Sequence, residues 1–109
     1  MAKSRVSTIR RLARQGKYTL SIHAERERQA DQLSTAELEQ ALGSCALVED
    51  YPDDPRGASC LVVGFAAGRP VHAVCALKQF PEEVLLITVY DPSRRPGKWV
   101  DNYHRRREK

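Results

Sequence analysis

The spacing of turn residues after Gly43 constrains the fold more than any other feature of this chain. Four short apolar runs follow it, interrupted by Pro and Gly, and predict β-strands near residues 45–51, 59–66, 70–78 and 84–91. The segments between these runs are too short for the helix that a parallel crossover requires. Consecutive strands are therefore expected to pair antiparallel, as a four-stranded meander.

The residues before Gly43 follow a helical pattern instead. A serine stands where each of three helices would begin, and its side-chain oxygen can accept a hydrogen bond from the first turn. These capping residues are Ser4, Ser21 and Ser34. Glu37 completes a capping box in the third helix, the first helix is expected to run to about Gln15, and residues 18–20 form a short extended link. The expected fold class is α+β, with N-terminal helices packed on one face of a four-stranded antiparallel sheet.

The chain is expected to form a single domain over residues 1–109. Independent domains usually run from about 50 to 200 residues, so a chain of this length holds one core. Hydrophobic residues make up 41% of the sequence but aromatic residues only 6%, so Val, Leu, Ile and Ala must supply most of that core and no large cofactor cavity is expected. We divide the chain into a basic helix (1–17), a helix-then-sheet core (18–95) and a basic tail (96–109). The tail is expected to form a short helix through Trp99 and Tyr103.

The charged residues are unevenly distributed. Lys and Arg number 18 against 14 Asp and Glu, and the net charge of +4 gives a modest preference for polyanions. Basic residues open and close the chain, at Lys3, Arg5, Arg10, Arg11, Arg14, Lys17, Arg105, Arg106, Arg107 and Lys109. Acidic residues gather at 49–54, where carboxylates invite a magnesium hypothesis, but Pro52 and Pro55 make a solvated turn the simpler interpretation. We therefore expect neither a metal nor a cofactor.

The cysteines give no sign of a metal or redox site. Cys45, Cys60 and Cys75 lack the close spacing that such sites use, and they are expected to be reduced, buried strand residues. The sequence shows neither the apolar N-terminal run of a signal peptide nor the roughly 20 apolar residues of a membrane span. A cytoplasmic location without membrane contact is therefore expected.

The segment from Tyr18 to Arg28 carries the strongest chemical signal. It places His23 and Arg26 on neighbouring turns at the start of the second predicted helix. A histidine can move a proton and an arginine can position a phosphate, so His23 is the first candidate for base or acid and Arg26 for phosphate binding. Two structural alternatives stay open: His23 could be buried and brace the helix start, and Arg26 could pair with a neighbouring carboxylate.

A second group of polar residues is expected on the sheet. A loop centred on Pro81 sets His72 opposite Tyr90 and Val74 opposite Thr88. This register gathers His72, Thr88 and Tyr90 on the less apolar face of the sheet, and strict alternation along the strand places Leu86 on the same face as Thr88 and Tyr90. His72 or Tyr90 is then the candidate for a second proton position, although His72 could hydrogen-bond locally and Tyr90 could simply fill a strand end.

These residue types suit one reaction in particular. RNA cleavage without a metal needs a base for the ribose 2′-hydroxyl proton, an acid for the leaving oxygen, and cations for the charge that develops on the phosphate. The catalytic candidates are His23, His72 and Tyr90. The candidates for nucleic-acid or phosphate binding are Arg26, Arg69, Arg94 and Arg105.

A set of short segments also carries a family resemblance. They are residues 21–26 (SIHAER), 41–42 (AL), 48–52 (VEDYP), 61–64 (LVVG), 68–72 (GRPVH) and 87–90 (ITVY), with Trp99 before the arginine-rich end. Together, from Tyr18 onward, they resemble the bacterial family called domain of unknown function 4258. The resemblance implies a helix-then-sheet fold similar to that of the RelE-like ribonuclease toxins and their wider barnase-like relatives. It also implies a toxin role in a pair with a small antitoxin, which in this setting can carry a zinc-finger domain.

Three functions from different classes are therefore considered. The first is a metal-independent ribonuclease toxin, for which a ribosome can help to position the RNA. The second is a non-catalytic module that holds RNA or an acidic protein through the basic helix and tail, with an affinity that falls steeply with salt. The third is a structural subunit whose exposed edge strand pairs with a partner chain.

Overall fold

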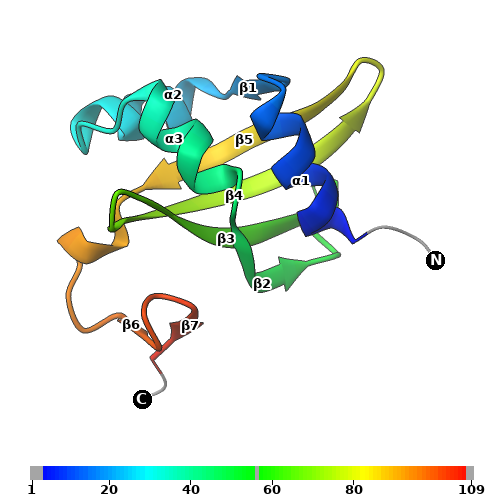
Figure 1. Ribbon diagram of the computed structural model, residues 1–109. Coiled ribbons are helices and arrows are strands. Elements are labelled where there is room, and N and C mark those ends of the chain that lie inside the picture. The colour runs from blue at the N-terminus through cyan, green and yellow to red at the C-terminus, as the bar shows by residue number, and fades with distance from the viewer. Residues whose placement is uncertain (1–3, 56, 108–109) are drawn as a thin grey trace.

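A mixed β-sheet with helices on one face forms the centre of the protein (Figure 1). The computed structural model describes residues 4–55 and 57–107. The strands of this sheet are β1 (Tyr18–Leu20), β2 (Ala46–Tyr51), β3 (Ser59–Ala66), β4 (Arg69–Gln79) and β5 (Glu82–Tyr90), in the spatial order β1-β5-β4-β3-β2. The helices are α1 (Arg5–Arg14), α2 (Ile22–Ala30) and α3 (Thr35–Leu42). The predicted α+β class is confirmed.

The predicted four-stranded antiparallel sheet needs one correction, because the sheet has a fifth strand. Strands β2, β3, β4 and β5 pair antiparallel in sequence order, as predicted. The segment expected as an extended link is β1, which pairs parallel with β5 and sets Thr19 beside Leu85. The short-turn argument does not apply to this pair, because two helices and three strands separate β1 from β5 along the chain.

Each helix begins at the predicted serine. The hydroxyl oxygens of Ser4, Ser21 and Ser34 accept hydrogen bonds from backbone N–H groups of the first turn at 3.1, 3.0 and 3.0 Å. In α3 the carboxylate of Glu37 also accepts from the backbone N–H of Ser34 at 2.9 Å, so the capping box is complete. These caps satisfy donors that a helix start otherwise leaves unpaired.

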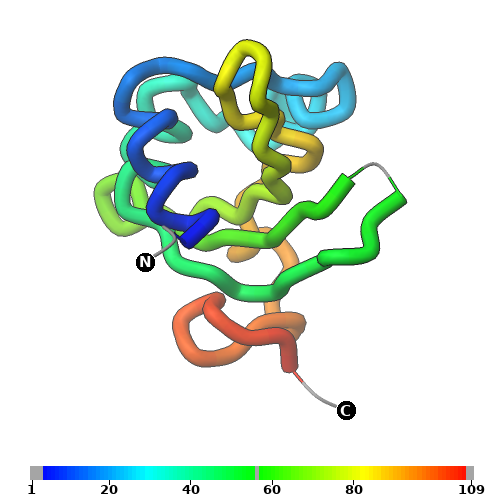
Figure 2. Tube along the Cα trace, turned by 90° about the vertical axis from the view of Figure 1, so that its right-hand side faces the viewer, coloured from blue at the N-terminus to red at the C-terminus, as the bar shows by residue number. Residues whose placement is uncertain are grey.

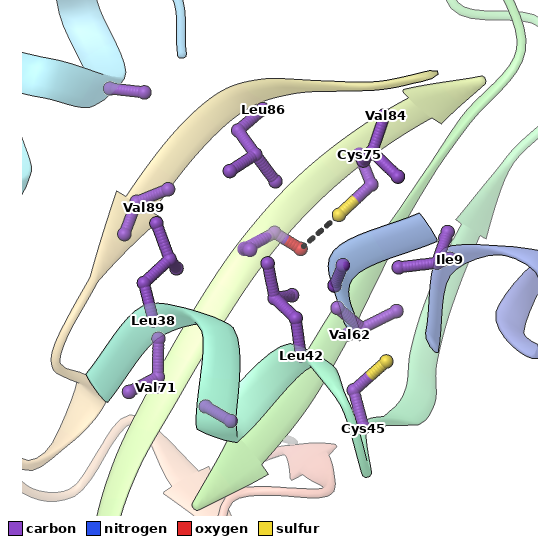
Figure 3. Packing of buried hydrophobic residues seen from close by; sticks show 14 of the residues in the cluster. Ile9, Leu38, Leu42, Cys45, Val62, Val71, Cys75, Val84, Leu86 and Val89 are labelled. Atoms are coloured by element: carbon purple, nitrogen blue, oxygen red, sulfur yellow. Dashed lines mark hydrogen bonds between the residues drawn. The ribbon is translucent and has the colours of Figure 1, made fainter. Parts of the chain in front are cut away.

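The helices enclose the main core against the sheet. In Figure 3, Leu38 and Leu42 of α3 point toward the strands, where Val71, Leu86 and Val89 lie. The core is aliphatic, as the composition predicts. Its members are Ile9, Leu12, Ala13, Ala24, Leu33, Leu38, Ala41, Leu42, Cys45, Cys60, Val62, Val71, Ala73, Cys75, Val84, Leu86 and Val89.

The three cysteines lie in this core as free thiols, as predicted. Burial raises the pKa of the Cys45 thiol to about 11, and it also raises the pKa of Cys60 and Cys75. Since the thiolate is the reactive form, these side chains act as small apolar residues.

Helix α3 approaches β3 very closely at Gly64. A Cβ atom built on Gly64 would overlap the backbone carbonyl of Ala41 and stand 2.9 Å from the Ala41 Cα. A residue without a side chain is therefore what lets the helix pack on this strand.

The pairing of β4 with β5 confirms the predicted register at one end and corrects it at the other. His72 pairs with Tyr90 and Val74 with Thr88, as predicted. Strict alternation of side chains along β5 predicts that Leu86 lies on the same face of the sheet as Thr88, and this prediction is wrong. The next pair is Cys75 with Leu86, so a β-bulge at Ile87 turns Leu86 into the main core.

The C-terminal segment covers the face of the sheet opposite the helices (Figure 2). A short 3₁₀-helix (Pro92–Arg94) is followed by a hairpin of β6 (Trp99–Val100) and β7 (Arg105–Arg106). The predicted helix through Trp99 and Tyr103 is therefore wrong. Asp101, Asn102 and Tyr103 have φ angles of 53°, 55° and 70°, and this left-handed backbone turns the chain instead of continuing a right-handed helix.

Within the described residues, no helix is both long enough and apolar enough to cross a membrane.

Candidate functional site

Two of the three polar residues predicted on the sheet, Thr88 and Tyr90, line a small pocket near the end of β5. Its volume is about 210 Å³, and we call it the Tyr90 pocket. Helix α2, strand β5, the segment before the hairpin and the first residue of β6 contribute its walls. The lining residues are Glu27, Thr88, Tyr90, Arg95, Lys98 and Trp99.

His72 and Tyr90 form a hydrogen-bonded pair beside this pocket. The Tyr90 hydroxyl lies 3.0 Å from His72 Nδ1, and His72 Nε2 lies 2.8 Å from the backbone carbonyl oxygen of Tyr103. A carbonyl oxygen can only accept, so Nε2 carries the hydrogen and Nδ1 accepts from the Tyr90 hydroxyl. The hairpin thereby fixes the tautomer of His72, and His72 fixes the orientation of Tyr90.

Both members of the pair are neutral near pH 7. His72 is fully buried, and burial lowers its pKa to about 4, although the hydrogen bond to Tyr103 acts in the opposite direction. Burial raises the pKa of Tyr90 to about 12, while the charges of Arg106 and Arg95 oppose this shift. His72 therefore positions Tyr90, and Tyr90 presents a protonated hydroxyl.

The low pKa of His72 predicts a pH-dependent stability. The unfolded chain binds a proton at His72 below about pH 6.5, but the folded protein does so only below about 4, so stability is present at neutral pH and is lost as pH falls through this window. Between pH 7 and pH 5 the free energy of unfolding should fall by about 2 kcal/mol from this group. Urea unfolding at the two pH values measures the change.

A His72→Gln variant is the control for this prediction, because it lacks the titrating ring and keeps a polar side chain. Its loss of stability between pH 7 and pH 5 should be smaller than that of the wild type by about 2 kcal/mol. An equal loss in both proteins would show that other groups cause it.

His23 joins the pocket indirectly, through Glu27. His23 Nε2 lies 3.2 Å from Glu27 Oε1, which also accepts the backbone N–H of Val89 at 3.1 Å. The alternative of a buried brace is wrong, because 67% of the His23 side chain is exposed and Ser21 caps the helix. Within the described structure His23 makes no polar contact with His72 or Tyr90, and each histidine is linked to the pocket through a lining residue, His23 through Glu27 and His72 through Tyr90.

Two exposed cations line the pocket, Arg95 and Lys98. A third candidate, Arg26, lies on the exposed surface of α2, the helix that carries Glu27. Within the part of the chain that the structure describes, none of these three side chains makes an ion pair or a hydrogen bond. They are therefore available to bind an anion.

The other predicted phosphate ligands have partners within the protein. Arg69 donates to the buried carboxylate of Asp91 at 2.9 Å, and it also donates to the backbone carbonyls of residues 31 and 32. The Arg94 guanidinium approaches Asp31 at 3.9 Å, and the Arg105 guanidinium pairs with Asp101 at 2.7 Å. Phosphate binding by these arginines stays a prediction, and the contacts of Arg69 give it a structural role at the start of β4.

The basic arms fold back onto the acidic segment. Arg5 of α1 pairs with Asp50, and Arg106 of the hairpin makes two contacts of 3.0 Å with Glu49. The Arg106 hydrogen bonds lower the pKa of Glu49. Across the residues described, no group of three or more His, Cys, Asp or Glu is arranged to hold a metal ion.

Sequence reasoning missed four residues of the site. Glu27 had a detectable signal, since it lies one helical turn after His23. Arg95, Lys98 and Trp99 had none, because their position depends on how the tail folds over the sheet.

Comparison with known proteins adds one finding. The family model described as Domain of unknown function (DUF4258) matches residues 20–91. This range contains His23, Glu27, His72 and Tyr90, and it ends before the cations of the tail. Neither the curated proteins nor the solved structures gave a match.

Proposed function

The chain belongs to the family described as Domain of unknown function (DUF4258), and from its pocket we propose that it is a metal-independent ribonuclease acting at the Tyr90 pocket. One observation carries the proposal. Glu27, the partner of His23, and Tyr90, the partner of His72, line a single pocket together with the exposed cations Arg95 and Lys98. Separate proton-handling groups and cations are what cleavage of RNA without a metal requires.

The geometry supports a division of roles. If His23 Nε2–H donates to Glu27, its Nδ1 is free to take the proton of a ribose 2′-hydroxyl, and the Glu27 carboxylate stabilises the imidazolium that forms. The 2′-oxygen then bonds to phosphorus and the bond to the 5′-oxygen breaks. Tyr90, whose raised pKa keeps it protonated, releases its hydrogen bond to His72 Nδ1 and gives its proton to the leaving oxygen. The products are a 2′,3′-cyclic phosphate and a free 5′-hydroxyl.

Arg26, Arg95 and Lys98 bind the phosphate in this scheme. Their charges stabilise the phosphorane as it forms, since none of the three cations has an anionic partner among the described residues. The similarity to RelE-like toxins and the role in a toxin–antitoxin pair belong to the same proposal. They rest on the sequence resemblance, and expression in bacteria with and without a candidate antitoxin tests them through growth arrest and its relief.

A direct test uses purified protein and RNA in EDTA, with and without ribosomes. We expect cleavage that leaves 2′,3′-cyclic phosphate ends, in at least one of the two reactions. Intact RNA in both reactions would contradict the proposal. Cleavage with ribosomes alone would agree with it, because the ribosome can position the RNA.

A second candidate function is a non-catalytic RNA-binding module. The observation that favours it is the protonation of the buried pair: the pKa values of His72 and Tyr90, about 4 and about 12, both lie far from pH 7, where a general acid or base is most effective. In this case RNA should bind with a strong salt dependence, remain uncleaved, and bind equally well to a His23→Ala variant.

A further inference from the structure

A second pocket lies next to the Tyr90 pocket and shares two of its residues. Its volume is about 370 Å³, and the hairpin turn and the segment after β5 line it. We call it the hairpin pocket. Arg95 and Trp99 line both pockets, while Ser93, Asn102 and Tyr103 belong to the hairpin pocket only. A ligand that fills both pockets must therefore pass Arg95 and Trp99.

We infer that the hairpin pocket is a subsite for one nucleobase of single-stranded RNA, with Arg95 binding the phosphate between that nucleotide and the nucleotide in the Tyr90 pocket. The inference rests on the proposed function, because it names the part of the substrate that lies outside the reacting site.

Arg95 suits the phosphate between two nucleotides. Its guanidinium is exposed and makes no ion pair or hydrogen bond within the described part of the chain. Lys98 lies on the side of the Tyr90 pocket, with its ammonium 6.0 Å from the centre of the Trp99 ring. A planar guanidinium can contact two phosphate oxygens at once, so Arg95 can hold a phosphodiester at the boundary of the two pockets.

The hairpin pocket suits a base. The half-buried Tyr103 ring provides aromatic surface, and stacking of a base on an aromatic side chain contributes about 1–3 kcal/mol. The exposed side-chain amide of Asn102 has no hydrogen-bond partner among the described residues, and an amide can donate to and accept from a base edge. These groups favour a flat polar ring over an aliphatic ligand.

Trp99 adds an independent sign of a missing partner. The residue is 7% exposed, and its indole Nε1–H has no acceptor in the described structure. An unsatisfied buried donor costs about 1–3 kcal/mol, so such groups need an explanation. A phosphate or ribose oxygen at the boundary of the two pockets would supply the acceptor.

The test uses Trp99 as its own reporter, because it is the only tryptophan in the sequence. Dinucleotides with a 2′-O-methyl group on the first ribose cannot be cleaved, since the attacking hydroxyl is blocked. We expect a saturable change in Trp99 fluorescence on titrating the four homodinucleotides, and a smaller response to the mononucleotides.

Two variants and one control sharpen the test. Arg95→Gln should weaken dinucleotide binding about tenfold, the loss of one charged phosphate contact. Asn102→Gly removes the amide while it tolerates the left-handed backbone, and it should reduce the difference in affinity among the four bases. Lys17→Gln is the control, because it removes one positive charge beside Val84, at the far end of β5. It should change neither the affinity for dinucleotides nor the difference in affinity among the four bases.

The outcomes separate this inference from the proposed function. No fluorescence response to dinucleotides, unchanged binding in Arg95→Gln, or an equal response to a short acidic peptide would overturn the subsite. Dinucleotide binding by a protein that cleaves no RNA would overturn the ribonuclease and leave the subsite in place. The emission maximum of each free variant shows whether the hairpin still buries Trp99.

Discussion

Gly64→Ala is expected to lower the free energy of unfolding by about 3 kcal/mol, at the upper end of the usual cost of overpacking a core. The added methyl group would overlap the backbone carbonyl of Ala41. A backbone carbonyl cannot rotate away as a side chain can, so α3 must shift off β3 and open the core around Leu38 and Leu42. Thermal unfolding should show a midpoint lower by about 12 °C or more.

Gly43→Ala is the matched control. Gly43 lies at the end of α3 with a right-handed φ of −63°, and its added Cβ would stand 3.2 Å from the Glu39 carbonyl oxygen and 3.3 Å from Cγ of the Arg14 side chain. A small adjustment relieves these contacts, so the change in stability should stay within about 1 kcal/mol. Similar losses in the two variants would show that the approach of α3 to β3 at Gly64 does not limit the packing.

The features that local chemistry decides could be predicted from the sequence. A serine hydroxyl caps a helix through contacts that span three residues, so Ser4, Ser21 and Ser34 mark the helix starts without any knowledge of the rest of the fold. The pairing of His72 with Tyr90 was predicted correctly, but for an incomplete reason. Beside the loop Gln79 pairs with Glu82, one residue away from the register of a loop centred on Pro81, and the extra residue of the bulge restores that register near the site.

The features that depend on distant contacts could not be predicted. The three residues of β1 are too few to show a strand pattern, and their pairing partner lies more than sixty residues away. The bulge at Ile87 changes the alternation of β5 by one residue, and a regular period of two cannot foresee it. The result is a correct prediction for Thr88 and Tyr90 and a wrong one for Leu86, on the same strand.

The tail shows the same limit at the functional site. The run of arginines in the sequence is typical of a basic tail in solvent. In the structure, however, Arg106 pairs with Glu49 and lies 4.7 Å from the centre of the Trp99 ring. These contacts fold the hairpin over His72 and place Arg95 and Lys98 at the pocket. Total charge therefore says little about which cations are free, since α1 uses Arg5 and Arg11 in ion pairs with Asp50 and Glu82.

His23→Ala is expected to reduce RNA cleavage by about 100-fold or more, because a positioned general base contributes about 10²–10⁴ to such reactions. The stability of the variant should stay within about 0.5 kcal/mol of the wild type, since the replaced side chain is mostly exposed. Initial rates on one RNA substrate in EDTA, together with thermal unfolding of both proteins, measure the two effects separately.

Gln29→Ala provides the control on the same helix, where the Gln29 amide donates to Glu25 at 2.7 Å and does not line the pocket. It should cleave RNA at the wild-type rate. Tyr90→Phe removes the proposed proton donor and should lose activity while still binding the uncleavable dinucleotides. If His23→Ala cleaves as fast as Gln29→Ala, the base must be another group. Glu27 is then the next candidate, because its carboxylate lines the pocket and its removal would also cost the hydrogen bond to the Val89 N–H.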